Sequence, residues 1–458
     1  MKKFALFSLV LFLNIDNGSA QTKFSAEQLK NDIDFLFNKL EYIHPNLFAY
    51  TSKNETYQAI SRVKSEIRDS LNSIDFWLMV CPIVNNLHQG HTGITPQNTE
   101  VNKYIIKLQE TGFSYFPFSI IILDSSIYVH DIYTNNRDIQ RGNKVISING
   151  VKASDILSSL VKYESGERKE YRLHYVEKRF IWNYPLLYPN SRYKVKYMDK
   201  GIEKTIILNG ITEKETDEYF MKAFASAKNN YRLILVDNKT ACIEYNACVD
   251  FDKFKLFLDS TFTIIKHNRI SNLIIDIRTN GGGDTGLNAL LLTYLTSNPF
   301  FEYSKHIEKL TSDIRTSNEY YSQFKKDTIL ERTKYQYFEN KVENPLLFKG
   351  NVFLLTGIET FSSGTELAML IKDYNLGKII GQETGGIPTC YGDRFDFELP
   401  NTKIEVGVSY KWSLRPSGVD DNRGVIPDII LNPSLMDILL DKDKEMNYAL
   451  NYIKNHTR

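Results

Sequence analysis

The sequence has few of the residues that build covalent or metal-bound scaffolds. Its 458 residues include 4 cysteines, and their spacing matches no metal site. A chain of this length can bury enough apolar surface to fold without disulfides, so we expect buried free thiols at least as readily as bridges. The sequence leaves their pairing open and implies no metal and no organic cofactor. The cysteines are Cys81, Cys242, Cys248 and Cys390.

The chain also has little excess charge. Its formal net charge of +1 argues against nucleic acid or an anionic membrane as the main partner. The hydrophobic fraction of 42% and the charged fraction of 24% are ordinary for a soluble globular protein. Internal repeats and low-complexity tracts are absent, and the length suits about two or three domains.

Long hydrophobic runs are absent as well. The run Phe4 to Leu13 is too short to span a bilayer. It follows Lys2-Lys3 and precedes the small residues Gly18-Ser19-Ala20, which together predict a signal peptide over residues 1–20. Because no cysteine lies near this site, a lipid anchor is not expected. We therefore expect an exported protein, periplasmic or extracellular, without a membrane span.

The remaining sequence divides into regions with different patterns. Residues 21–110 have helical periodicity. Residues 111–212 consist mainly of strand runs, and the turn that starts at Gly142 and ends in Ile148-Asn149-Gly150 resembles the signature turn of a PDZ module. From 225 to 458 strands and helices alternate, which predicts an α/β layered fold.

Two segments look like insertions. The first, residues 164–189, would be an unusually long insertion in a PDZ module. Such a module binds an extended peptide at its sheet edge. Residues 302–345 are polar and rich in Tyr and Lys, and we expect them to be mostly helical. This second segment is either a lid or a solvated excursion.

The stretch from Gly350 to Gly386 organises the chain. It reads as strand, turn, helix and strand, with two serines and Gly364 at the strand-to-helix joint. A serine there stands beside free backbone N–H groups, which can hold an oxyanion while the hydroxyl attacks a carbonyl. The alternative is a capping box formed by Ser363 and Glu366, since a serine before a helix commonly caps it.

Three other loops carry residue types that acyl transfer needs. His91 lies beyond a predicted helix, and a histidine suits the role of base because its pKa is near working pH. Gly281 to Gly283 could supply an oxyanion donor without a side chain in the way. Asp420 and Asp421 could supply the carboxylate that orients the imidazole.

In this order the motifs resemble the S41 family of serine peptidases, which includes the C-terminal processing peptidases and the tricorn core. The resemblance covers nearly the whole mature chain and implies an α/β (α+β multidomain) fold. It consists of a helical N-terminal region, a PDZ-like module and a crotonase-like (ClpP/crotonase) core. The matching stretches run from Asp276 to Gly283, Thr360 to Glu366, Gly381 to Gly386 and Asn422 to Asp428.

The resemblance also implies roles for individual residues. The family nucleophile lies three positions before the Glu of its serine motif, which selects Ser363 over Ser362. Where one branch uses a lysine base, this chain has Ile387, so His91 in Gly90-His91-Thr92 matches the histidine-dependent branch. The position of the third member falls on Asp421, where the family has Glu, with Asp420 as a rival. The implied oxyanion donors are Gly364 and either Gly281 or Gly282.

The resulting prediction is an exported serine endopeptidase that cleaves polypeptides. One alternative is a catalytically inactive peptide- or ligand-binding protein on the same fold. A remote alternative is a dinucleotide-binding oxidoreductase, because Gly281, Gly283 and Gly286 match the spacing of a dinucleotide fingerprint after a strand.

Overall fold

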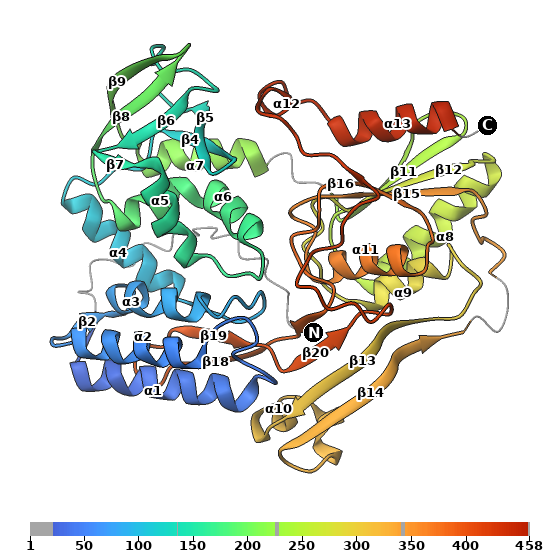
Figure 1. Ribbon diagram of the computed structural model, residues 1–458, viewed down its shortest axis with the longest axis horizontal. Helices are drawn as coiled ribbons and strands as arrows, with labels where there is room; N and C mark the ends of the chain where they lie inside the picture. The colour runs from blue at the N-terminus through green and yellow to red at the C-terminus, as the bar shows by residue number, and fades with distance from the viewer. Residues whose placement is uncertain (1–21, 135, 225–228, 340–343, 457–458) are drawn as a thin grey trace.

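The computed structural model describes residues 22–134, 136–224, 229–339 and 344–456. A helical N-terminal part lies beneath a middle module, and both stand beside a large sheet-containing core (Figure 1). The predicted signal peptide lies outside the described residues. Within the described ranges, none of the helices combines the length and the apolar character needed to cross a membrane.

The N-terminal helices begin as their sequence predicts. Ser25 and Gln28 form a reciprocal capping box at the start of α1, and the apolar positions of this helix are buried. Their core extends beyond the N-terminal part, because Leu310 and Val406 pack into the same cluster. The elements are β1 (Lys23–Phe24), α1 (Ala26–Ile43), α2 (Lys53–Glu66), β2 (Leu71–Asn72), α3 (Ser73–Asn85), β3 (Gly93–Thr95) and α4 (Asn98–Glu110).

A small antiparallel sheet joins the N-terminal part to a segment late in the chain. β3 pairs with β19 (Glu405–Val408), which pairs in turn with β18 (Phe395–Glu398). Two strands close together in the sequence, β18 and β19, thus share a sheet with β3, a strand from before residue 110. Buried Asp32 of α1 strengthens the joint by accepting bonds from Asn401 and Thr402.

The middle module is a strongly bent antiparallel sheet covered by helices. Its strand order is β4-β5-β6-β8-β9, with β7 paired to β6. The segment flagged as an insertion contains α6, which packs along the edge strand β4. The elements are β4 (Phe118–Leu123), β5 (Ser126–Ile132), β6 (Lys144–Ile148), β7 (Val151–Lys152), α5 (Ala153–Leu160), a 3₁₀ turn (Val161–Tyr163), α6 (Lys169–Leu187), β8 (Arg192–Asp199) and β9 (Ile202–Asn209).

The core is a six-stranded sheet of order β10-β11-β12-β15-β16-β21, parallel except for β10. Its strands read as continuous apolar runs because both faces are covered. The helix α7 (Glu213–Phe224) precedes this sheet in the chain and lies beside the middle module (Figure 1). The elements of the core are β10 (Tyr231–Leu235), β11 (Thr240–Tyr245), α8 (Phe251–His267), β12 (Asn272–Asp276), α9 (Gly286–Leu292), β15 (Asn351–Thr356), α11 (Ser363–Asp373), β16 (Lys378–Gly381), β21 (Ile429–Ile430), α12 (Leu435–Leu439) and α13 (Lys444–His456).

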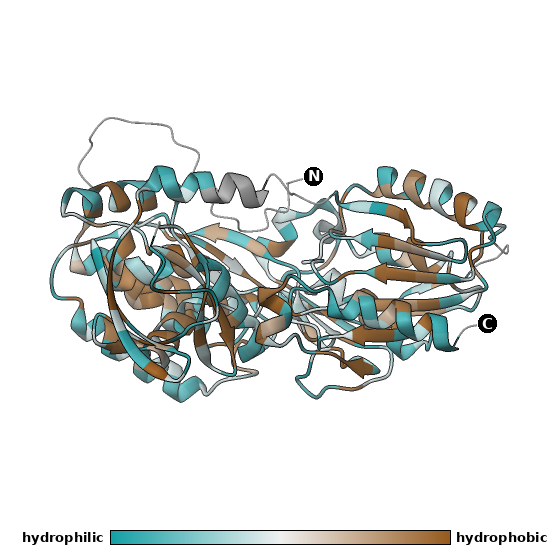
Figure 2. Cartoon of the chain, turned by 90° about the horizontal axis from the view of Figure 1, so that it is seen from above, coloured by the Kyte–Doolittle hydropathy of each residue, from teal (hydrophilic) through white to brown (hydrophobic). Residues whose placement is uncertain are grey.

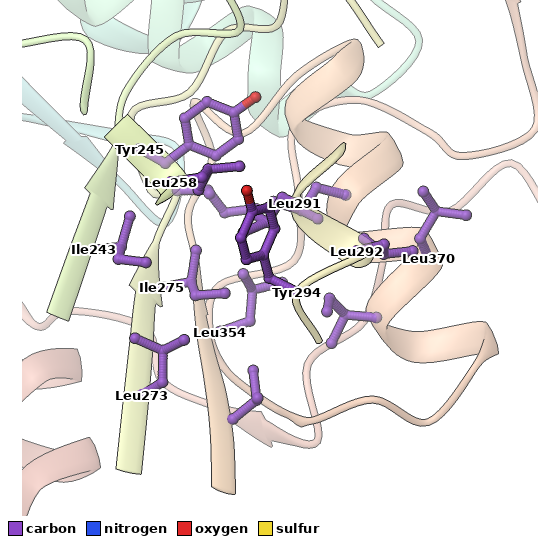
Figure 3. Packing of buried hydrophobic residues seen from close by; sticks show 14 of the residues in the cluster. Ile243, Tyr245, Leu258, Leu273, Ile275, Leu291, Leu292, Tyr294, Leu354 and Leu370 are labelled. Carbon is purple, nitrogen blue, oxygen red and sulfur yellow. The ribbon is translucent and has the colours of Figure 1, made fainter. Parts of the chain in front are cut away.

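Each face of this sheet has its own apolar cluster. Ile243, Ile275 and Leu354 point toward α8, α9 and α11, where Leu258, Leu291 and Leu370 meet them (Figure 3). Ala449 and Ile453 of α13 cover the opposite face. Hydrophobic residues lie mainly on the strands between these layers, as the view from above shows (Figure 2). Because β12, β15 and β16 are parallel, the loops that follow them emerge together at the carboxyl ends of the strands, where open α/β folds bind their ligands.

The segment 302–345 is not mostly helical, so that prediction is wrong. Residues 300–338 form a long hairpin, in which β13 alternates buried and less buried residues with the period of a strand. The hairpin is no free lid, because β13 pairs with β20 and Ile314 enters the N-terminal core. The elements are β13 (Phe300–Leu310), α10 (Ser312–Ser317), a 3₁₀ turn (Glu319–Gln323), β14 (Thr328–Phe338), β17 (Cys390–Gly392) and β20 (Lys411–Leu414).

All four cysteines are free thiols, three of them buried and Cys390 partly exposed. The expectation of buried free thiols is confirmed for Cys81, Cys242 and Cys248. In the described ranges, no group of three or more His, Cys, Asp or Glu side chains is arranged to hold a metal ion.

The joint between α1 and the 400–402 turn leads to a stability prediction. Replacing Asp32 by Ala should lower the free energy of unfolding by about 3 kcal/mol, because it leaves buried donors of the turn without a charged acceptor. Urea unfolding of the purified protein measures the change. The matched control is Asn38→Ala on the exposed face of the same helix, which should shift stability little. Equal stability of the two variants would contradict the prediction.

Candidate active site

Ser362 occupies a sharp turn between β15 and α11. Its backbone has φ 49° and ψ −124°, a conformation that non-glycine residues rarely adopt. Such strain at a strand-to-helix turn exposes a nucleophile above a sheet edge. The Ser362 side chain makes no capping bond to α11 and is only partly buried. Its hydroxyl is therefore available for chemistry.

His91 faces this serine. Its Nε2 lies 3.1 Å from the Ser362 Oγ, although the residues are 271 positions apart in the chain. The imidazole stacks on Phe361, with ring centroids 5.1 Å apart and planes inclined by 29°. After the histidine, the Thr92 Oγ1 accepts the Ser409 N–H at 3.1 Å. The structure thus brings a histidine to a serine with the geometry that proton transfer needs.

The environment of His91 favours its neutral form. Burial lowers the pKa of this imidazole below its ordinary value of 6.5. The charge of Asp393 and the nearby Tyr391 backbone oppose this lowering, and Arg394 adds to it. The His91 Nδ1 is buried and makes no well-formed hydrogen bond to any described residue.

The structure does not place Ser363, the predicted nucleophile, opposite the histidine. Ser363 is the first residue of α11, its side chain is 3% exposed, and its Oγ donates to the Gly283 carbonyl at 2.7 Å. A hydroxyl held in this way points toward the glycine loop. The alternative capping box between Ser363 and Glu366 is not formed either. Counting from the turn instead of from Glu366 would have selected Ser362, because the strained position precedes the helix.

Glu366 is a structural partner beneath the turn. Its carboxylate accepts from the Tyr303 hydroxyl at 2.8 Å and from the Asn288 amide at 3.3 Å. Asn288 also donates to the Ser363 carbonyl at 2.7 Å, so it links Glu366 to the backbone after the turn. Burial, with a smaller effect from Asp284, raises the pKa of Glu366 to about 7. Glu302 lies nearby. Burial, with a smaller effect from the charge of Glu366, raises the pKa of Glu302 well above its ordinary value.

Asp421 does not meet His91. It is exposed, and its carboxylate accepts the Arg423 N–H of its own turn at 3.1 Å. Asp420 is exposed too, and burial and the charge of Asp421 raise its pKa. In the described part of the chain, no hydrogen bond or ion pair joins either carboxylate to the imidazole. The structure therefore brings neither Asp421, the predicted third member, nor its rival Asp420 to the histidine.

The glycine loop lies against the serine turn. A Cβ on Gly282 would come within 2.7 Å of the Ser362 Cβ and 2.9 Å of the Ser363 backbone nitrogen. The N–H of Gly282 donates to the Asn280 side chain at 2.9 Å, and that of Gly364 donates to the Phe361 carbonyl at 2.9 Å. Two of the predicted oxyanion donors are thus already engaged. The Ser363 N–H, beside the loop, was missed because the serine was placed one residue too late.

The same glycines explain the dinucleotide-like fingerprint. A Cβ on Gly283 would lie 2.0 Å from the Cys248 carbonyl oxygen, and Gly283 has φ 139°. These glycines allow the protein's own backbone to approach closely, so the loop does not form a phosphate cradle. At the base of this loop Arg278 forms an ion pair with Asp276 at 2.7 Å and a second one with Asp443 at 2.6 Å.

Known proteins share this architecture. Residues 240–431 match the family described as Peptidase family S41. No curated protein matches the sequence. Among solved structures, mature CPAF has a TM-score of 0.63 at 16% identity, covering 94% of this chain and 99% of that one. A serine-to-alanine mutant of CPAF has a TM-score of 0.65 at 15% identity, covering 94% and 96%.

At these identities the two structures establish a shared fold, and the sequence match carries the family assignment. Residues 240–431 therefore match peptidase family S41, and this domain makes the chain a hydrolase of the serine-peptidase type.

Proposed function

We propose that this chain is an exported serine endopeptidase in which Ser362 is the nucleophile and His91 is the base. The observation that carries the proposal is the 3.1 Å approach of the His91 Nε2 to the Oγ of a serine in a strained turn. Export rests on the sequence of residues 1–20. A polypeptide substrate follows from the family.

The reaction follows from this geometry. Neutral His91, with its proton on Nδ1, accepts the Ser362 proton at Nε2 while the Oγ attacks the scissile carbonyl. The histidine then returns the proton to the leaving amine. Water takes the same path in the second half of the reaction and releases the acyl group from Ser362.

The oxyanion needs donors beside the Ser362 Oγ. We assign the N–H of Ser363, which lies next to Gly282, and the N–H of Gly281. The strained turn aims the first of these N–H groups, since it belongs to the residue directly after the nucleophile. Gly282 and Gly364 support this pocket through their backbone but donate elsewhere.

The middle module was predicted to bind substrate in an extended form. A PDZ-like module would add a peptide to a sheet edge. At the edge strand β4, however, the Ile122 N–H already donates to Glu177 of α6 at 2.6 Å. A peptide added there would have to displace this carboxylate. We therefore assign the module a supporting role at the catalytic site.

The inactive binding protein remains the competing function. An assembled Ser–His pair argues against it, because a binding role places no demand on a strained serine at contact distance from a histidine. Labelling with a serine-directed probe separates the two functions.

The nucleophile can be identified with a fluorophosphonate probe. Ser362→Ala should abolish labelling and turnover, because it removes the attacking oxygen. Ser363→Ala is the matched control. It removes only the hydroxyl bond to Gly283 and keeps the backbone N–H, so labelling should remain within about tenfold of the wild type. Mass spectrometry of the labelled peptide locates the modified serine. Labelling of Ser363 in the Ser362→Ala variant would contradict the assignment.

The base can be tested by substitution. His91→Gln should reduce kcat/KM by about 10³-fold or more, because the proton acceptor is lost. Asp421→Asn should leave kcat/KM nearly unchanged, since this carboxylate lies in its own turn. Steady-state kinetics with peptide substrates, measured by the release of cleavage products, give the kcat/KM values. A loss in Asp421→Asn comparable to that in His91→Gln would restore the predicted triad.

The pH dependence follows from the buried imidazole. His91 must be neutral to accept the proton, and burial lowers its pKa. Activity should therefore be retained below pH 6.5 and fall only as the pH drops through the lowered pKa. The rate constant of fluorophosphonate labelling, measured between about pH 4 and 9, gives the midpoint. A midpoint above 6.5 would show that a carboxylate dominates the environment of the ring.

A further inference from the structure

The start of α6 reaches from the middle module into the active site. Glu167 lies just before this helix, and its Oε1 accepts the backbone N–H of Gly90 at 2.8 Å. Gly90 directly precedes His91. The base therefore follows a residue whose backbone is fixed by a carboxylate from another part of the fold.

Tyr171, in the first turn of α6, contacts the other member of the pair. Its ring stacks on Phe361, with centroids 4.7 Å apart and planes inclined by 15°. Phe361 directly precedes Ser362, and it also stacks on His91. Three rings thus lie in sequence, with the phenylalanine between the tyrosine and the histidine. Offset-stacked rings hold one another in orientation as well as burying apolar surface.

Arg168 completes the contact. Its guanidinium donates to the carbonyl oxygens of Glu383 and Thr384 and pairs with the Glu383 carboxylate at 3.2 Å. These residues belong to the loop after β16, one of the motifs that carried the family resemblance. The segment Glu167 to Tyr171 therefore touches the histidine loop, the serine turn and the loop beside them.

Two glycines make room for this segment. A Cβ on Gly90 would lie 2.6 Å from the Glu167 Oε2 and 2.8 Å from the Phe361 Cζ. A Cβ on Gly385 would lie 2.4 Å from the Tyr171 Cδ2, in addition to a clash with the Ile358 carbonyl. The catalytic loops and the segment are thus shaped to each other at two separate points.

We propose that the segment Glu167–Tyr171 is a positioning clamp, supplied by the middle module, that holds His91 and Ser362 in reacting geometry. The inference rests on the proposed function. The His91 Nδ1 makes no well-formed hydrogen bond to a described residue, although the Tyr391 backbone lies near the ring, so packing and the anchored loop contribute to its orientation. The clamp supplies both, through Tyr171 by way of Phe361 and through Glu167 by way of Gly90.

The clamp also couples catalysis to the module. Further along α6, Phe180 and Tyr184 are fully buried in the apolar core of the module. One continuous helix therefore joins that core to the catalytic pair. A shift of the module relative to the core would move Tyr171 and Glu167, and with them the two catalytic loops.

The ring stack is tested with variants of Tyr171. Tyr171→Leu should slow fluorophosphonate labelling of Ser362 by about 10- to 100-fold, the cost of a catalytic group displaced by roughly 1 Å. Tyr171→Phe keeps the stack and should retain most of the rate. Tyr197→Leu, at a buried tyrosine of β8 outside α6, is the control. It should lower the thermal unfolding midpoint, because it leaves a cavity in the module core, while the folded protein labels at the wild-type rate.

The Glu167 contact is tested separately. Glu167→Ala removes the acceptor for the Gly90 N–H and should slow labelling by about tenfold, whereas Glu167→Gln keeps an oxygen acceptor and should restore most of the rate. If the wild type is labelled and both Tyr171→Leu and Glu167→Ala are labelled at the wild-type rate, the clamp proposal is wrong while the proposed function stands. A folded wild type that neither labels nor turns over would overturn the proposed function and the clamp with it.

Discussion

The contact between His91 and Ser362 is the constraint on which the rest of the structure depends. It joins a loop after the N-terminal helices to a turn near the end of the core sheet, so the chain must fold both regions as one body. The shared apolar cluster, the pairing of β3 with β19 and the buried Asp32 carboxylate all serve this requirement. The position of His91 is fixed in this way, because its loop lies between α3 and β3, which both belong to this shared core.

Several steps of this arrangement follow from the sequence. The alternation of strands and helices after residue 225 and the glycine motifs predict loops that meet at the carboxyl ends of the core strands, and they do. His91 was selected because a family motif marks it, and the structure places it opposite Ser362. The count from Glu366 selected Ser363, because the strained turn before α11 is revealed by φ and ψ and not by residue types. Asp421 was misplaced for a similar reason, since a nearby motif does not determine where a short side chain points.

The hairpin of residues 300–338 was misjudged because polar and aromatic residues suit an amphipathic helix and an exposed strand alike. Only its pairing with β20 decides between them, and that partner lies about a hundred residues away. The role of Glu167 and Tyr171 was equally hidden. Neither residue belongs to a recognised motif, and both act through the residue before a catalytic one. Long-range contacts of this kind are properties of the fold, and local patterns carry no trace of them.

Among the described residues no carboxylate bonds to the His91 Nδ1, so the proposed serine–histidine pair must solve two problems by other means. The first is orientation, which here comes from the stack on Phe361 and from a loop fixed on both sides, at Gly90 and at Thr92. The second is the charge that the imidazole gains during reaction. Asp393 favours that charge through space although Lys411 already pairs with it, so its help is partial. Burial opposes the charge and keeps the resting histidine neutral. In the proposed reaction, a neutral imidazole is ready to accept a proton but its charged form is weakly stabilised, so the proposal depends on precise placement of the ring.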